Sequence, residues 1–291
     1  TALQRFNGMF AFALWDEDEK ILHLARDRFG EKPLYLGWCG STFLFGSEMK
    51  ALGAHPHFCG EIDCAALAEF MRLGYVPAPL SIFRGVGKLP PATYVSIDAR
   101  ARAACALPAP RAYWSARETA LNALARPFRG SDSDALDALD AALRKAVGMR
   151  TFADVKVGAF LSGGIDSSAI VAVMQALASS PVLTFTIGTE DAAYNEAPFS
   201  AAVAGHLGTR HEVRTVTARM AKDIIPRLPE YYCEPFADSS QIPTVMLAQM
   251  ARQHVTVALS GDGGDELFGG YNRHIWAHRA TRAAGRLPAF L

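Results

Sequence analysis

The order of apolar and polar residues divides the chain into two parts of different character. Between residue 6 and about residue 100, short runs with β character alternate with Gly, Asp and Pro, which predicts strands of an antiparallel sheet. One segment with helical spacing, residues 65–73, interrupts them. The predicted strands are residues 9–14, 22–24, 34–38, 42–45 and 93–97.

The second part begins after a stretch with few long apolar periods. Residues 99–133 are rich in Ala, Arg and Pro, which is typical of a linker. Residues 134–147 then show helical spacing, with Ser131, Asp132 or Ser133 as the candidate N-cap. We therefore predict a first domain over 1–100, a linker over 101–133 and a second domain over 134–291.

Strands and helices alternate in the second domain. The strands are predicted at 155–161, 183–187, 211–216 and 255–259, and the helices up to residue 178 and at 196–207, 218–227 and 243–253. This alternation predicts a parallel sheet flanked by helices. Ligands of such sheets bind beyond the carboxyl ends of the strands. Three of those ends carry polar or Gly-rich residues: 161–167, 187–188 and 260–266.

The first of these ends reads Leu-Ser-Gly-Gly-Ile-Asp-Ser-Ser over residues 161–168. Two glycines let the backbone approach an anion closely, and the next helix offers unpaired N–H groups. Ser162, Ser167 and Ser168 add hydroxyl donors, and Asp166 is suited to hold Mg²⁺ against phosphates. The spacing is not that of a Walker loop, because no Gly-x-x-x-x-Gly-Lys-Ser/Thr occurs. The alternative is an ordinary Gly-rich turn.

A second polar motif, Ser-Gly-Asp-Gly-Gly-Asp-Glu-Leu-Phe-Gly-Gly-Tyr, occupies residues 260–271. Asp262, Asp265 and Glu266 lie close together in sequence and repel one another unless a cation or water is present. A metal site accounts for this cluster, and a flexible acidic surface loop is the alternative.

These motifs carry a family resemblance. Residues 161–168 resemble the SGGxDS signature of the PP-loop ATP pyrophosphatases, which cleave ATP between its α and β phosphates. Together with residues 260–271 they resemble the synthetase domain of glutamine-dependent asparagine synthetases. Residues 8–16, 25–35 and 47–52 resemble the later part of that family's class II glutamine amidotransferase domain. The implied fold is an α/β PP-loop domain, like an adenine nucleotide alpha-hydrolase, preceded by the partial antiparallel β-sandwich of an N-terminal-nucleophile amidotransferase.

The resemblance also implies roles for individual residues. Backbone groups of Leu161, Ile187 and Gly261 would hold adenine and ribose, with Ser260 beside them. Ser162, Gly163, Gly164, Asp166 and Ser167 would grip the pyrophosphate of ATP. Asp166 and Asp265 would bind Mg²⁺, and Asp262 would take part with Asp265 in forming the acyl-adenylate. Asp238, Ser239 and Ser240 resemble the amino-acid-binding loop, although these residues also suit the N-cap of the helix near residue 241.

The implied reaction uses ATP and Mg²⁺ to convert aspartate to β-aspartyl-AMP, which ammonia released from glutamine then attacks to give asparagine. The alternatives are a β-lactam synthetase-like or other amide-forming relative and a non-catalytic ATP-binding module. A tRNA-thiolating relative would carry a cysteine pair and a basic face, and neither is evident. The family's glutaminase cysteine lies upstream of the first strand, so we expect Thr1 to be a cut end. A lysine important for adenylation would follow residue 291.

Composition adds the cellular context. The 29 basic and 29 acidic residues of the 291 cancel, and no basic stripe is present, which argues against nucleic-acid and membrane partners. No apolar stretch reaches the ~20 residues of a membrane span. Five cysteines without a regular framework predict reduced thiols in a cytoplasmic protein. A zinc site at Cys59 and Cys64 with His55 and His57 is disfavoured because the spacing fits no common finger. A homodimer is compatible with these features.

Overall fold

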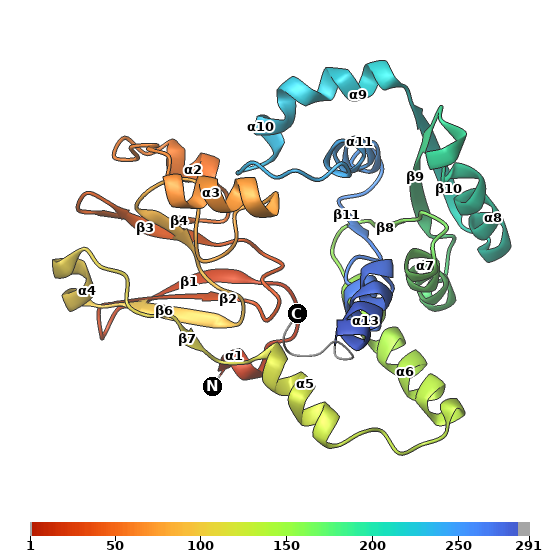
Figure 1. Ribbon diagram of the computed structural model, residues 1–291, viewed down its shortest axis with the longest axis horizontal. Coiled ribbons are helices and arrows are strands. Elements are labelled where there is room, and N and C mark those ends of the chain that lie inside the picture. The colour runs from red at the N-terminus through yellow and green to blue at the C-terminus, as the bar shows by residue number, and fades with distance from the viewer. Residues whose placement is uncertain (1, 285–291) are drawn as a thin grey trace. The chain divides into compact units, whose positions relative to one another are not determined.

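A computed structural model of the chain describes residues 2–284 (Figure 1). It divides into two compact units. The first contains Thr1–Phe128 and Pro226–Ser239, and the second contains Arg129–Ile225 and Ser240–Leu291. Thr1 and the end of the predicted second domain, residues 285–291, lie outside the described residues.

The first unit contains two antiparallel sheets. One has the strand order β1-β2-β6-β7 and the other the order β4-β3-β5. The strands are β1 (Ala11–Asp16), β2 (Ile21–Arg26), β3 (Tyr35–Cys39), β4 (Thr42–Gly46), β5 (Val86–Lys88), β6 (Thr93–Ile97) and β7 (Arg111–Ala112). The antiparallel character predicted from the short β runs is confirmed.

Alternation along β3 sets the two layers of this unit. Leu36 packs with Leu24 and Val95 of the other sheet, whereas Tyr35 and Cys39 point to a second core. That second core includes the helix α2 (Met49–Gly53), and a neighbouring cluster includes α3 (Cys64–Leu73). The result is the expected sandwich of two sheets, with helices covering the second face of the β3 sheet (Figure 1).

The segment expected to be a linker contains regular structure. It holds α4 (Ala99–Ala104), β7 and α5 (Ala116–Ala125), and β7 pairs with β6 through Thr93 opposite Ala112. No residue of α5 is buried. Its start is fixed by Ser115, whose side chain accepts a hydrogen bond from the Glu118 N–H. The short helix α1 (Ala2–Arg5) precedes the first sheet.

A buried carboxylate organises the turn between β2 and β3. Asp27 is 1% exposed, and its two oxygens accept the backbone N–H groups of Phe10, Phe29, Glu31 and Lys32 at 2.9–3.2 Å. This part of the amidotransferase-like motif therefore serves the fold of the first unit.

The second unit is built on a parallel sheet with the order β10-β9-β8-β11. These strands are β8 (Val157–Phe160), β9 (Leu183–Thr189), β10 (Arg210–Val216) and β11 (Val257–Leu259). The helices are α6 (Asp132–Thr151), α7 (Ile165–Leu177), α8 (Ala197–Leu207), α9 (Ala218–Ile224), α11 (Gln241–Ala251), α12 (Gly264–Phe268) and α13 (Asn272–Ala284). The predicted alternation is confirmed, and Ser131 caps α6 in a capping box with Asp134.

Helices cover both faces of this parallel sheet. Ala159 and Leu161 pack with Val171 of α7 and Ala204 of α8. Phe185 of β9 is fully buried on the other face, with Met250 and Ala251 of α11 (Figure 1). All four carboxyl ends consequently lie at one edge of the sheet.

The first unit also includes a segment from much later in the chain. Residues 226–239, which contain α10 (Leu228–Tyr231), are counted with it, although they lie in sequence between α9 and α11 of the second unit. The periodicity of the sequence does not indicate this excursion.

Candidate functional site

The loop between β8 and α7 is shaped by its own glycines and hydroxyls. Gly163 has a φ of +82°, and a Cβ there would lie 2.8 Å from the backbone of Phe199 and Ser200. The Ser162 and Ser167 hydroxyls lie 2.8 Å apart, and Ser162 Oγ also accepts the Gly164 N–H at 3.2 Å. The loop is therefore held in one conformation by bonds within itself.

Helix α7 begins directly after this loop with Gly164 as its N-cap. The N–H groups in the first turn of any helix have no partner within the helix. In α7 no side chain of the N-cap residue accepts them either. The positive end of the helix dipole adds to their attraction for an anion. Asp166, in that first turn, adds a carboxylate suited to a cation.

The second loop packs directly against the first. A Cβ on Gly261 would lie 2.7 Å from the backbone nitrogen of Ser167. A Cβ on Gly264 would lie 2.4 Å from the carboxylate of Asp166. The two motifs, about a hundred residues apart in sequence, thus meet at the sheet edge because β8 and β11 are neighbouring parallel strands.

The acidic side chains of the second loop take different directions. Asp262 accepts a hydrogen bond from the Ser260 hydroxyl at 3.0 Å. Glu266 accepts one from the Tyr271 hydroxyl at 2.8 Å, and this bond lowers the pKa of the Glu266 carboxyl. Asp265 directs one oxygen toward Gly270, where a Cβ would lie 1.9 Å from it. Glu266 is thus engaged in holding the loop, and Asp262 and Asp265 are candidates for the site.

The third of the predicted strand ends, residues 187–188, is the carboxyl end of β9. Leu161 is 1% exposed, and its backbone groups are engaged, the N–H with the Phe185 carbonyl at 3.0 Å and the carbonyl with the Thr186 hydroxyl. Ile187 is partly buried and packs toward α11. Gly188 lies against Asn195, whose side-chain oxygen accepts the Ala197 N–H at 3.1 Å and the Thr189 N–H at 3.4 Å and so ties the strand to α8.

The sequence patterns did not single out two residues between β9 and α8, Asn195 and Glu196. Asn195 closes the turn, and the next residue, Glu196, has its carboxyl pKa raised by burial. Polar residues placed directly before a helix were the available signal, but that pattern is also typical of an ordinary cap. They are further candidates for the site.

The predicted amino-acid-binding residues lie where the two units join in sequence. Asp238 and Ser239 are counted with the first unit, and Ser240 opens α11 of the second. Ser240 is the N-cap by position, but its side chain makes no cap bond. The structure brings together the three ends of the sheet within one unit, whereas Asp238 and Ser239 belong to the other unit.

Metal binding has two candidate places. Within residues 2–284, no group of three or more His, Cys, Asp and Glu side chains is arranged to hold an ion. At the disfavoured zinc site, His57 Nδ1 lies 2.6 Å from the Thr42 hydroxyl. The Asp166 carboxylate lies against Gly264, the chain neighbour of Asp265. Both aspartates carry the hard oxygen atoms that Mg²⁺ prefers when phosphate oxygens complete its shell. The residues present thus fit a magnesium ion that arrives with a nucleotide.

Comparison with known families agrees with both halves of this description. Residues 138–290 match the asparagine synthase family model, and residues 1–114 match the glutamine amidotransferase domain model. Fold and site together define a class of protein in which an amidotransferase-type β-sandwich precedes a PP-loop α/β unit. The chain belongs to the asparagine synthase family.

Its relatives carry corresponding names. A "Putative asparagine synthetase (glutamine-hydrolyzing) 2" of Methanocaldococcus jannaschii is 35% identical over 99% of this chain and 54% of its own length. A "Putative asparagine synthetase (glutamine-hydrolyzing)" of Mycobacterium tuberculosis is 40% identical over 92% of the chain and 40% of its own length. "Asparagine synthetase (glutamine-hydrolyzing) 1" of Bacillus subtilis is 33% identical over 93% and 41%. The chain thus spans about half the length of these relatives or less.

Solved structures similar to part of the chain include one synthetase. It is the NH3-dependent NAD synthetase from Campylobacter jejuni, 14% identical, with a TM-score of 0.34 over 47% of this chain and 60% of that one. Among the described helices, none combines the length and the apolar character that crossing a membrane requires.

Proposed function

We propose that the second unit is the ATP-dependent, AMP-forming part of an amide ligase that makes asparagine from aspartate and ammonia. The observation that carries this proposal is the packing of Gly261 and Gly264 against Ser167 and Asp166. It places, at one edge of a parallel sheet, the first turn of α7 and the Asp166 carboxylate beside the loop that carries Asp262 and Asp265. Such an arrangement suits the triphosphate of a nucleotide.

In this proposal the loop binds the pyrophosphate part of ATP. The N–H groups of the first turn of α7 donate to the phosphate oxygens, while Gly163 lets the backbone approach them. Ser162 and Ser167, already bonded to each other, keep those donors in place. Backbone groups of Leu161, Ile187 and Gly261 face the adenine and ribose, with Ser260 beside them.

Asp166 and Asp265 would hold Mg²⁺, which neutralises the charge of the leaving pyrophosphate when it is bound. The substrate carboxylate attacks the α-phosphorus, the bond between the α and β phosphates breaks, and pyrophosphate leaves. Asp262 orients the reacting groups. The product of this step is an acyl-adenylate, from which ammonia then displaces AMP. Preorganised donors at the loop favour this step because charge accumulates on the departing group.

The amino acid would bind at Asp238, Ser239 and Ser240. A carboxylate and two hydroxyls suit the ammonium and carboxylate groups of aspartate. The relatives' names describe them as glutamine-hydrolyzing, and we propose on this ground that ammonia arrives from glutamine. The amidotransferase-type unit would belong to that half-reaction.

A β-lactam synthetase-like or other amide-forming relative is the competing enzyme, because the same loops would activate a different acid. A module that binds ATP without catalysis is the competing non-enzyme. The presence of Asp166, Asp262 and Asp265 together argues for catalysis over mere binding.

The deciding experiment uses the protein expressed from its complete reading frame. With ATP, magnesium and ammonium, we expect AMP and pyrophosphate release that depends on aspartate and is matched by asparagine. Release with another acid alone would identify a specialised relative. No release with any acid would contradict the proposal and leave the non-catalytic module.

A further inference from the structure

The segment 226–239 is fastened to the rest of the first unit at successive points along its length. Two of these contacts reach α2, one reaches Gly74 at the end of α3, and Glu234 reaches β3, β5 and Ile82, so the segment cannot shift as a whole without breaking several of them. These contacts are Lys50 Nζ to the Glu230 carbonyl at 2.5 Å, the Met49 N–H to Cys233 Sγ at 3.3 Å, the Glu234 carboxylate described next, and the Ala237 N–H to the Gly74 carbonyl at 2.6 Å.

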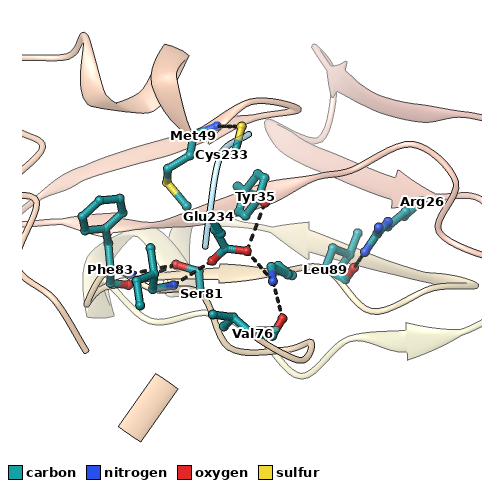
Figure 2. Close-up of polar contacts among 11 residues, drawn as sticks. Arg26, Tyr35, Met49, Val76, Ser81, Phe83, Leu89, Cys233 and Glu234 are labelled. Carbon is teal, nitrogen blue, oxygen red and sulfur yellow. Dashed lines mark hydrogen bonds and ion pairs between the residues drawn. The ribbon is translucent and has the colours of Figure 1, made fainter. Parts of the chain in front are cut away.

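Glu234 is the centre of this attachment, as Figure 2 shows. One carboxylate oxygen accepts the Ile82 N–H at 2.7 Å. The other accepts the Tyr35 hydroxyl at 3.2 Å and forms an ion pair with Lys88. The Glu234 side chain is 9% exposed and that of Lys88 is 17% exposed.

A buried ion pair of this kind selects a geometry more than it stabilises a fold. Removing charges from water is costly, and an apolar pair of similar size is often equally stable. The donors around Glu234, by contrast, fix the direction of its side chain and hence of the backbone that carries it. Lys88 is itself held by the Val76 carbonyl at 2.6 Å, and burial together with Glu234 raises the pKa of Tyr35 so that its hydroxyl stays a donor.

The candidate amino-acid-binding residues follow this attachment with little slack. Ala237 is bonded to Gly74, and α11 begins at Gln241, so only residues 238–240 connect the two. Three residues span at most about 11 Å when fully extended. The backbone that leads into Asp238 and Ser239 is therefore held on its N-terminal side by the Glu234 attachment.

We propose that Glu234 is a positioning residue for the amino-acid substrate. Through Tyr35, Lys88 and Ile82, the amidotransferase-type unit holds residues 238–240 in the conformation that binds the amino acid. This inference rests on the function proposed above for those three residues. It follows that the first unit contributes to amide synthesis even when free ammonia replaces glutamine.

The test compares Glu234→Gln and Lys88→Met with the unchanged protein, expressed from the complete reading frame and supplied with ammonium as the only nitrogen donor. We expect KM for aspartate to rise about tenfold, the equivalent of one charge-assisted hydrogen bond, while KM for ATP stays within about twofold. The variant that carries both substitutions should have the same KM for aspartate as Glu234→Gln alone, because both changes break the same ion pair.

The matched control is Arg84→Met. Arg84 forms an ion pair with Glu61 at 2.5 Å in the same unit, but both side chains are more than half exposed. This variant should keep the KM of the unchanged protein for both substrates, since exposed pairs contribute little.

The outcomes separate the two proposals. If the unchanged protein shows no aspartate-dependent pyrophosphate release, the proposed function fails before any variant is made. If it does, but Glu234→Gln keeps its KM for aspartate, the positioning role is wrong. An equal rise of KM for ATP and aspartate would indicate a general structural effect and also overturn it. If Glu234→Gln fails to fold, the test uses Tyr35→Phe and Lys88→Met instead. If these two variants fold and keep the KM for aspartate of the unchanged protein, the positioning role of Glu234 is wrong.

Discussion

Gly261 faces the backbone nitrogen of Ser167 so closely that a Cβ on the glycine would lie 2.7 Å from that nitrogen. The acidic loop thus rests directly on the first turn of α7, whose N–H groups we propose as phosphate donors. Any side chain at residue 261 must push the two loops apart, although the backbone there is not in a left-handed conformation.

We therefore expect Gly261→Ala to weaken ATP binding by at least about tenfold, because overpacking of this kind costs about 1–3 kcal/mol. Calorimetric titration with ATP and magnesium would measure the change. Gly205→Ala is the control, since a Cβ there meets nothing within 4 Å and the residue lies inside α8. That control should gain up to about 1 kcal/mol of stability and bind ATP normally. Equal ATP affinity in both variants would contradict the packing argument.

Asp166 and Asp265 are expected to act in the same step. In the protein from the complete reading frame, Asp166→Ala or Asp265→Ala should reduce pyrophosphate release by at least about a hundredfold, because the charge of the leaving group is no longer neutralised. Glutaminase activity, measured as glutamate formed from glutamine, should persist. Parallel loss of both activities would point to misfolding. Asp154→Ala, at an exposed position before β8, serves as the control.

Asp27 gives a prediction about stability. Asp27→Ala leaves four backbone N–H groups without their acceptor, so the first unit should lose about 3 kcal/mol or more of unfolding free energy. Asp16→Ala is the comparison, because Asp16 accepts two N–H groups, those of Asp18 and Glu19, in an exposed turn. Its cost should be about 1 kcal/mol. Urea unfolding of the two variants measures both values, and similar midpoints would refute the role of Asp27.

His211 predicts a dependence of stability on pH. Its Nδ1 lies 2.9 Å from the Thr184 hydroxyl, its Nε2 has no partner among the described residues, and burial lowers the pKa of its imidazole. The unfolded chain takes up a proton near pH 6.5, which the native state does not bind as readily, so native stability falls as the pH drops below that value. His211→Asn should reduce this loss. Thermal melting at pH 7.5 and pH 5.5 would show it, and an identical fall in both proteins would exclude the explanation.

The sequence predicted those features that depend on local patterns. Ser131, one of the three predicted N-cap candidates, caps α6, and the loops after β8 and β11 are visible as glycines beside short polar residues. Parallel alternation then places both loops at one edge. The contact of Gly261 with Ser167 follows from this topology, but its closeness required coordinates.

Other features carry no local signal. Helix α5 buries no side chain, so the 99–133 segment lacks the apolar period by which helices are recognised. Strand β7 is only two residues long and exists because β6 offers it an edge. Asn195 resembles a simple helix cap until its contact with Gly188 is known.

The excursion of residues 226–239 has a consequence for how the protein is made. Glu234, which completes the polar core around Tyr35 and Lys88, is translated about a hundred residues after Phe128, the last residue of the main part of the first unit. During synthesis, the strands β8, β9 and β10 of the second unit are therefore translated before Glu234 is available to complete the polar core of the first unit. Domains generally fold in the order of their synthesis. Here the unit that is started first can be completed only after most of the second has been made.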